Sequence, residues 1–353
     1  MPKEDIINIS NIHTKIPNNL KEFDPSYITR YAITSELVSA AKSKTKNINS
    51  ILDVGGYNGA LSKFLKNEKI TIVDIAKDTT LKNYVRVNSV NLPFKDNEFD
   101  IVVSCDTLEH IKPKERDQFI AEMIRVSKHY VFICAPFGSD NVTKAEYMAD
   151  SFYKSMSGES YVWLKEHREY GLPKKDWIRK AIRKSNCFFD EFDHSSIDLW
   201  TLMLSSSFFL AGNILPVNKE FYDRLRQGGV QYAKDISFVD FPPEGYRTFF
   251  AISKNNKIKV NTPKYNKEIV DDYFLHEIKN IGKVLRDING SYGAALEKLD
   301  RFKNLVDENN RLAGELKSLR ANYENIIGSR SYVAIEKISH IKNALRKPNG
   351  KKK

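Results

Sequence analysis

A glycine-rich segment carries the strongest chemical signal in the sequence. Residues 51–59 read ILDVGGYNG, so an apolar strand runs into a turn that opens a helix. Glycines let the backbone turn sharply and approach a ligand closely. The spacing differs from the dinucleotide fingerprint GxGxxG. On its own, the segment therefore predicts a nucleotide-binding turn without naming its ligand.

Polar residues also follow the later apolar runs of the chain. Asp74 ends one such run, and a carboxylate at that place can accept hydrogen bonds from two hydroxyl groups. Asn88 and Ser89 open the segment NSVNLPF, which comes next along the chain. A third group, which follows another apolar run, contains Cys105, Asp106, Glu109 and His110.

Alternating strands and helices must position these groups. The expected strands are short, β-branched and apolar without alternation, which is typical of strands covered by helices on both faces. Such strand–helix alternation favours a mostly parallel sheet. Strands are predicted at 50–54, 69–74, 100–104, 129–135, 187–192 and 246–253, and helices at 27–41, 60–65 and 114–126. The last two strands are expected to pair antiparallel at the edge of the sheet.

Taken in order, these segments resemble the motifs of class I S-adenosylmethionine-dependent methyltransferases, of the methyltransferase type 11-like kind. The resemblance covers about residues 50–136. Within the motif D-x-G-x-G-x-G, Asp53, Gly55 and Gly59 match, and Tyr57 replaces the middle glycine. The resemblance implies an α/β fold with a doubly wound, mostly parallel seven-stranded sheet, and S-adenosylmethionine as the cofactor.

The same resemblance assigns roles to individual residues. It implies that Asp74 holds the ribose hydroxyls and that Asn88 meets the adenine edge, where the family commonly has Asp. The expected cofactor-binding residues are Asp53, Gly55, Gly56, Gly59, Asp74, Ile75, Asn88, Ser89, Cys105 and Asp106. Asp53 could instead cap a helix or orient loop amides, and Asp106 could be a helix N-cap.

A second group of residues lies where this fold builds its acceptor site. The segment APF at 135–137 and the segment EHREYGLP that begins at Glu166 resemble a signature of methyltransferases from surface-glycan biosynthesis clusters. This resemblance implies methylation of a sugar hydroxyl on a cell-surface glycan or a lipid-linked precursor. His110 and His167 are the candidate bases, because imidazole titrates near neutral pH. A packed structural histidine and a solvated helix face are the competing interpretations.

Two other functions stay open. One is an RNA or other small-molecule methyltransferase, and the other is a non-catalytic coiled-coil scaffold with an inert methyltransferase fold. The chain lacks the Pro-Cys pair of cytosine-5 methyltransferases and the D/N-P-P-Y/F motif of amino-methylating enzymes, which argues against nucleic acid as a partner. Cys105, Cys134 and Cys187 form no CxxC pair, so no metal site is expected.

The excess of basic charge lies at the C-terminus. The net charge is +11, yet residues 264–329 carry 11 basic and 11 acidic residues, whereas residues 330–353 carry 8 basic and one acidic, which gives +7. The segment 330–353 is typical of a tail that contacts an anionic membrane surface, with a solubilising tail as the alternative. Without a spanning apolar run or a secretory signal, a cytoplasmic protein is expected, peripheral at the inner face of the cell membrane.

Long helical periodicity precedes this tail. Apolar residues at 285–326 recur at steps of three and four, with Asn309 at a core position, which favours a homo-oligomeric coiled coil over a helix packed on its own domain. The expected organisation is a polar lead-in (1–24), a methyltransferase domain (25–255) with an acceptor-region insertion (about 138–245), a linker (256–267), a coiled-coil helix (268–329) and a basic tail (330–353).

Overall fold

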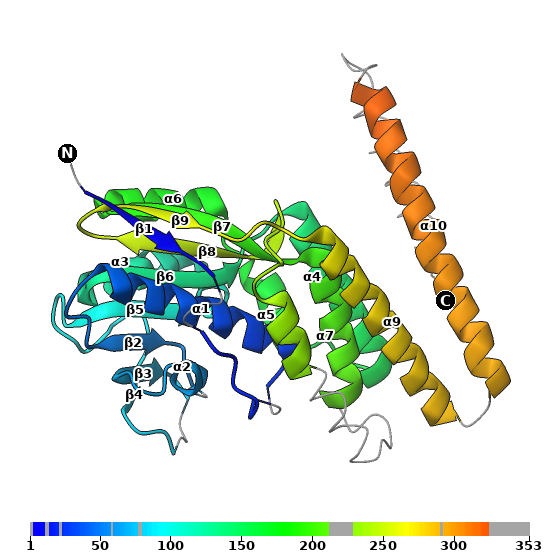
Figure 1. The fold of residues 1–353 in the computed structure, drawn as a ribbon, viewed down its shortest axis with the longest axis horizontal. Helices are drawn as coiled ribbons and strands as arrows, with labels where there is room; N and C mark the ends of the chain where they lie inside the picture. Colours follow the sequence, from blue (N-terminus) through cyan, green and yellow to red (C-terminus); the bar gives the residue numbers. More distant parts are fainter. Residues whose placement is uncertain are drawn as a thin grey trace, which may run out of the picture. The chain divides into compact units, whose positions relative to one another are not determined.

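The computed structural model describes residues 3–10, 14–20, 23–57, 59–76, 80–211, 229–289 and 292–324. Its main element is a seven-stranded sheet in the order β4-β3-β2-β5-β6-β8-β7 (Figure 1). The strands are β2 (Ile51–Val54), β3 (Ile70–Asp74), β4 (Tyr84–Arg86), β5 (Phe99–Cys105), β6 (Ser127–Pro136), β7 (Phe188–Ser196) and β8 (Gly245–Ser253). In this sheet β8 runs antiparallel to both of its neighbours, and the other six strands share one direction. The predicted mostly parallel sheet and its antiparallel last pair are confirmed, whereas β4 was not expected from the sequence.

Buried side chains of the strands alternate between two apolar cores, one on each face of the sheet. In β5, Ile101 and Val103 belong to one core, and Val102 belongs to the other. The covering helices are α1 (Pro25–Lys44) and α2 (Ala60–Phe64) on the first face, and α3 (Arg116–Val126) and α6 (Lys175–Lys184) on the second. Because both faces are covered, the strand sequences are continuously apolar.

The order of the strands places a switch point between β2 and β5. β3 pairs with one side of β2, and β5 pairs with the other. Ligands of open α/β sheets bind at the carboxyl ends of the strands beside such a point. The glycine-rich turn follows β2, and a short 3-10 helix, η1 (Leu108–His110), follows β5. Two of the polar groups found in the sequence therefore lie at this edge.

Three helices build a third core beyond the sheet. They are α4 (Asp140–Ser157), α5 (Val162–Tyr170) and α7 (Ile197–Ala211). The core between them contains Val142 and Ala149 of α4, Leu164 of α5 and Trp200 of α7. Ser139 caps the start of α4 by accepting a hydrogen bond from the Val142 amide (3.2 Å). This helical layer carries the acceptor-region residues that the sequence indicated.

Two strands lie in segments that the sequence analysis treated as a lead-in and a linker. β1 (Glu4–Asn8) and β9 (Lys257–Asn261) pair in parallel as a separate two-stranded sheet. Both strands alternate exposed and buried residues, and Ile7 and Val260 join the core under α1. Only the folded chain brings these short strands together, because about 250 residues separate the paired positions.

The C-terminal helices are α9 (Lys267–Asn289) and α10 (Tyr292–Glu324). The chain divides into two compact units, Met1–Lys283 and Val284–Lys353. Val270 of α9 is buried in the first unit among Leu199, Met203 and neighbouring residues, so this unit extends past the expected boundary at 267. The self-associating coiled coil stays a prediction, and the basic tail at 330–353 lies outside the described residues. Among the described helices, none is long and apolar enough to cross a membrane.

Candidate active site

Close contacts in the glycine-rich turn leave no room for a side chain at Gly55. Gly55 follows β2 with φ +81°, and a Cβ atom there would lie 2.0 Å from the Thr107 Oγ1. Its amide donates a hydrogen bond to the Val73 carbonyl (2.8 Å), which fixes the turn to β3. Gly59, with φ +66°, is the N-cap residue of α2. The turn thus joins strand and helix in a shape that a larger side chain at Gly55 would prevent.

Asp53 lies under this turn as a buried carboxyl group. It is 0% exposed, and both of its carboxyl oxygens lack a hydrogen-bond partner among the described residues. A Cβ atom at Gly56 would lie 2.3 Å from Asp53 Oδ2, so the backbone approaches the carboxyl group closely. Burial raises the pKa of Asp53 to about 7, and the nearby Asp74 adds to the shift.

An unpartnered buried acid of this kind fits the cofactor expected from the sequence. S-adenosylmethionine carries a sulfonium and an ammonium group, and either positive charge, or a water bound to it, would compensate the carboxylate. Asp74 stands at the end of the neighbouring β3, where its Oδ1 accepts a hydrogen bond from the Ala76 amide (3.0 Å). Ile75 beside it is 69% exposed. Asp74 is therefore placed at the carboxyl edge, where a ribose would meet it.

Two more of the expected cofactor residues lie in the loop after β4. Asn88 Oδ1 accepts a hydrogen bond from the Val90 amide (3.1 Å), which holds the side-chain amide in one orientation. Ser89 is buried beside it. Their contact with the adenine stays a prediction.

The end of β5 is occupied by an ion-pair network. Asp106 has φ +47°, a region that non-glycine residues rarely adopt. Its carboxylate accepts three hydrogen bonds from Arg247 (2.7–3.0 Å) and lies 3.0 Å from Arg30 Nη1. Burial opposes its ionisation, but Arg247 and Arg30 outweigh burial and lower the pKa of Asp106 to about 2. The two arginines therefore keep the Asp106 carboxylate ionised at neutral pH.

These partners distinguish Asp106 and Cys105 from the other expected cofactor residues. The Cys105 Sγ is buried and lies 3.1 Å from the Thr34 Oγ1 of α1. The carboxylate of Asp106 already has two cationic partners. No sequence pattern marked Arg30 and Arg247, since they stand on α1 and β8, far from Asp106 in the chain. A direct cofactor contact of Cys105 or Asp106 stays a prediction.

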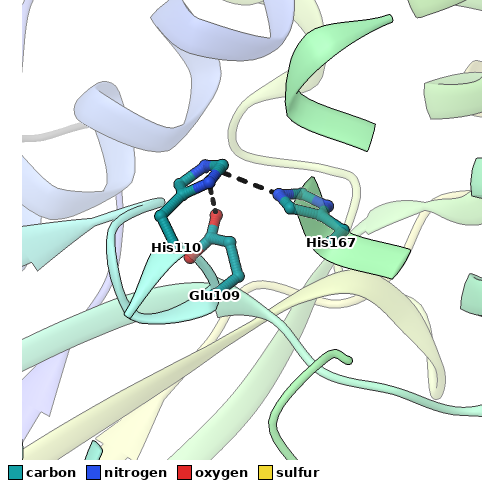
Figure 2. Close-up of side chains that lie close together, drawn as sticks. All are labelled: Glu109, His110 and His167. Carbon is teal, nitrogen blue, oxygen red and sulfur yellow. Dashed lines mark hydrogen bonds and ion pairs between the residues drawn. The ribbon is translucent and has the colours of Figure 1, made fainter. Parts of the chain in front are cut away.

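The two candidate bases lie side by side. His110 of η1 and His167 of α5 approach each other with their Nε2 atoms 3.5 Å apart (Figure 2). His110 Nδ1 lies 2.8 Å from Glu166 Oε2, and His167 Nδ1 lies 2.8 Å from Glu146 Oε1. An ionised carboxylate can only accept a hydrogen bond, so both Nδ1 atoms are donors. In the neutral imidazoles, each Nε2 therefore carries a lone pair.

A third residue, Glu109, completes this histidine cluster, which we define as Glu109, His110 and His167. Glu109 is 1% exposed, and its Oε2 is buried without a hydrogen-bond partner among the described residues. Its Oε1 lies 4.0 Å from His110 Nε2. Burial, and then the charge of Asp106, raise the pKa of Glu109 well above its ordinary value. Burial and the neighbouring His167 lower the pKa of His110, which Glu166 opposes.

Aromatic residues lie on both sides of the cluster. The Tyr246 hydroxyl donates a hydrogen bond to the same Glu146 oxygen (2.8 Å), and its ring stacks on Trp200. On the other side, Trp163 meets His110 edge-on at 5.1 Å between ring centroids and is 51% exposed. His167 is thus buried, whereas His110 is partly exposed (24%) beside an exposed indole. Glu146, Tyr246 and Trp200 were not expected from the sequence.

Comparisons with known proteins agree with the motifs. Residues 52–134 match the model of a methyltransferase domain family. Over 40 residues the chain is 48% identical to norajmaline N-methyltransferase of Rauvolfia serpentina, a match that spans 11% of this chain and 13% of that protein.

Solved structures with a similar architecture have low sequence identity. One, from Galdieria sulphuraria, is assigned as a sarcosine dimethylglycine methyltransferase (16% identity, TM-score 0.42, 65% of this chain and 89% of that chain). Another is a SAM-dependent methyltransferase of Archaeoglobus fulgidus (15% identity, TM-score 0.34, 65% and 98%). The family match covers β2 to β6 with the glycine-rich turn and Asp74. Residues 52–134 therefore match a methyltransferase domain, and this match supports the class I type with S-adenosylmethionine as the cofactor.

Proposed function

We propose that this protein transfers the methyl group of S-adenosylmethionine to a hydroxyl oxygen of an acceptor bound at the histidine cluster. The observation that carries this proposal is the pair of carboxylate-backed imidazoles, whose Nε2 atoms lie 3.5 Å apart at the carboxyl edge of the sheet. A hydroxyl is a weak nucleophile and must lose its proton at or near methyl transfer. A methyl group on sulfonium is already activated, so the chain mainly has to position and deprotonate the acceptor.

His110 is the group best placed to take the proton from the acceptor hydroxyl. It is partly exposed, and its lowered pKa favours the neutral imidazole that a base requires. As Nε2 accepts the proton, the imidazole becomes positively charged. The Glu166 carboxylate at Nδ1 (2.8 Å) then stabilises this imidazolium and holds the ring orientation.

The acceptor that we propose is a sugar of a cell-surface glycan or of its lipid-linked precursor. Besides the EHREYGLP segment, the exposed Trp163 beside His110 supports this choice. An indole offers a flat apolar face with a polar edge, which suits a ring that has both C–H faces and hydroxyl groups.

A nitrogen acceptor is the second candidate, because the short stretch of high identity belongs to an N-methyltransferase. A neutral amine can attack the methyl group before it loses a proton. The histidine cluster would then have little effect on the rate, which separates the two acceptor classes.

The experiment that tests the proposal measures transfer of labelled methyl groups into fractionated glycans, lipid-linked sugars, amines and RNA. We expect label in a sugar-containing fraction. His110→Ala and His167→Ala should lower turnover by about 10²–10⁴-fold, with little change in cofactor affinity. His129→Ala, a histidine on β6 outside the cluster, is the control and should retain turnover. Label in the amine or RNA fraction would exclude the proposed acceptor, and cofactor binding without transfer to any fraction would favour the scaffold.

The same proposal includes assembly through the C-terminal helix. On the described part of α10, Phe302, Leu305, Leu312 and Leu316 are exposed apolar residues at steps of three, four and seven. Such a stripe is stabilised when a second copy covers it. We place self-association at 285–326 and contact with an anionic membrane surface at 330–353.

A further inference from the structure

The histidine cluster combines three side chains that can bind a cation. Glu109, His110 and His167 each offer one ligand atom, and these atoms lie within 4.8 Å of one another. Glu109 and His167 are buried, and Figure 2 shows both histidine rings converging above the Glu109 carboxyl group. No hydrogen-bond donor among the described residues serves the Glu109 Oε2. A buried acid without a partner is costly unless a cation compensates it.

The contacts at Nδ1 point to a ligand between the rings. Because Glu166 and Glu146 accept the Nδ1 protons, the two Nε2 lone pairs face each other across 3.5 Å. Two lone pairs at this separation repel each other unless a proton or a metal ion lies between them. Carboxylates at the second nitrogen of metal-binding histidines also fix the tautomer and raise the basicity of the ligand. Both histidines have this arrangement.

The spacing agrees with tetrahedral coordination. Zinc–nitrogen bonds of about 2.0–2.1 Å at a tetrahedral angle place two nitrogen ligands about 3.4 Å apart. The observed distance between the Nε2 atoms is 3.5 Å. Glu109 Oε1 lies 4.0 Å from His110 Nε2, and the three ligand atoms lie within 4.8 Å of one another, so the Glu109 side chain would have to move towards the two nitrogens to bind the same ion. Three protein ligands leave the fourth position open.

We propose that Glu109, His110 and His167 bind one divalent transition-metal ion of the zinc type, with the fourth position open to water or to the acceptor oxygen. Two imidazoles and one carboxylate suit such an ion. No sequence pattern indicated this site, because Glu109 and His110 are neighbours whereas His167 stands on another helix. With the ion present, both Nε2 lone pairs bind metal. The acceptor hydroxyl would then be acidified by the ion and would release its proton to water.

The test measures metal binding itself, so it does not depend on methyl transfer. Tag-free full-length protein is stripped with a chelator and titrated with Zn²⁺ by calorimetry, and with Co²⁺ by visible absorption. We expect one ion per chain and the absorption bands of tetrahedral Co²⁺. Glu109→Gln and His167→Ala should each weaken Zn²⁺ binding at least about tenfold, and Glu146→Gln should weaken it by about 10–100-fold through the His167 ring.

Matched controls separate loss of a ligand from loss of the fold. His129→Ala should bind Zn²⁺ like the unaltered protein, and each variant should keep its cofactor affinity. Absence of stoichiometric binding by the unaltered protein, or equal affinity in the Glu109→Gln variant, would overturn the metal site. Zinc binding without sugar methylation would contradict only the proposed function, and sugar methylation without zinc binding would contradict only the metal site.

Discussion

The glycine-rich turn contains a fully buried aspartate and the end of β5 a partly buried one, and the two aspartates differ in their partners. Asp53 has no hydrogen-bond partner among the described residues, and burial raises its pKa to about 7. The side chain of Asp106 is 14% exposed, and Arg247 and Arg30 overcome the effect of its partial burial and lower its pKa to about 2. This difference in partners indicates that Asp53 serves to bind a ligand, whereas Asp106 serves to stabilise the fold. A buried acid that lacks a cation is placed to receive one from a ligand, whereas a fully paired acid stabilises the fold.

The largest effect should come from breaking the paired acid. Asp106→Asn leaves the Arg247 charge buried without its counterion, which should lower the free energy of unfolding by about 3–5 kcal/mol. Urea denaturation of the apoprotein would measure the loss. The control Asp96→Asn removes an exposed partner of Arg125 and should change stability by less than about 1 kcal/mol.

The pH dependence of this difference has a defined sign. The pKa of Asp106 is depressed in the folded protein, so its contribution to stability is complete above its ordinary pKa and is lost as pH falls towards about 2. The gap between the unaltered protein and Asp106→Asn should therefore be constant near neutral pH and narrow in acid. A gap that stays constant down to the acid limit would show that the arginines do not stabilise the carboxylate.

Removal of Asp74, the acid expected to meet the ribose, should have the next largest effect. Asp74→Ala should weaken cofactor binding by about 10–100-fold, because hydrogen bonds to an ionised partner contribute about 1.5–3 kcal/mol. Calorimetry with S-adenosylhomocysteine measures the change, and Asp96→Ala is the exposed control. Unchanged affinity in Asp74→Ala would place the ribose elsewhere.

A smaller effect should follow from protonation of Asp53. Its raised pKa of about 7 means that cofactor affinity should increase about tenfold between pH 6 and pH 8, as the carboxylate that the cationic cofactor favours is formed. Asp53→Asn should remove this slope. In the apoprotein the sign is reversed, because the raised pKa stabilises the fold at low pH and this contribution is lost as pH rises through 7. If cofactor affinity depends on pH in the same way in the unaltered protein and in Asp53→Asn, Asp53 does not face the positive charge of the cofactor.

The smallest effect on cofactor affinity should come from removing α10. Deletion of residues 290–353 keeps α9, whose Val270 packs in the first unit, and removes the exposed apolar stripe. Cofactor affinity should stay unchanged while the protein becomes monomeric by light scattering. Deletion of 330–353 alone should keep the oligomer and abolish flotation with anionic liposomes. An oligomer that survives the first deletion would exclude assembly through α10.

Features that are built from consecutive residues could be predicted from the sequence. The turn after β2 needs Gly55 at a positive φ and Gly56 where the backbone approaches Asp53, and both requirements are visible as glycines in one short segment. The position of Asp74 at the carboxyl edge was predicted for the same reason, since it ends an apolar strand, and its contact with the ribose stays a prediction. By contrast, the strands β1 and β9 were missed because each is short, and their pairing joins the two ends of the first unit.

The sequence by itself determined the class of fold, the glycine-rich turn after β2 and the presence of two chemically suitable histidines. These features depend on local backbone conformation and on apolar periodicity, which neighbouring residues specify. Only the tertiary structure decided that His110 and His167 meet, that Glu146 and Glu166 fix their tautomers, and that Glu109 lies beside them without a partner. It also decided which buried acid has cationic partners, because Arg30 and Arg247 reach Asp106 from α1 and β8. Charges interact through space, so the partners of a buried ionisable group can be assigned only once packing has brought distant elements together.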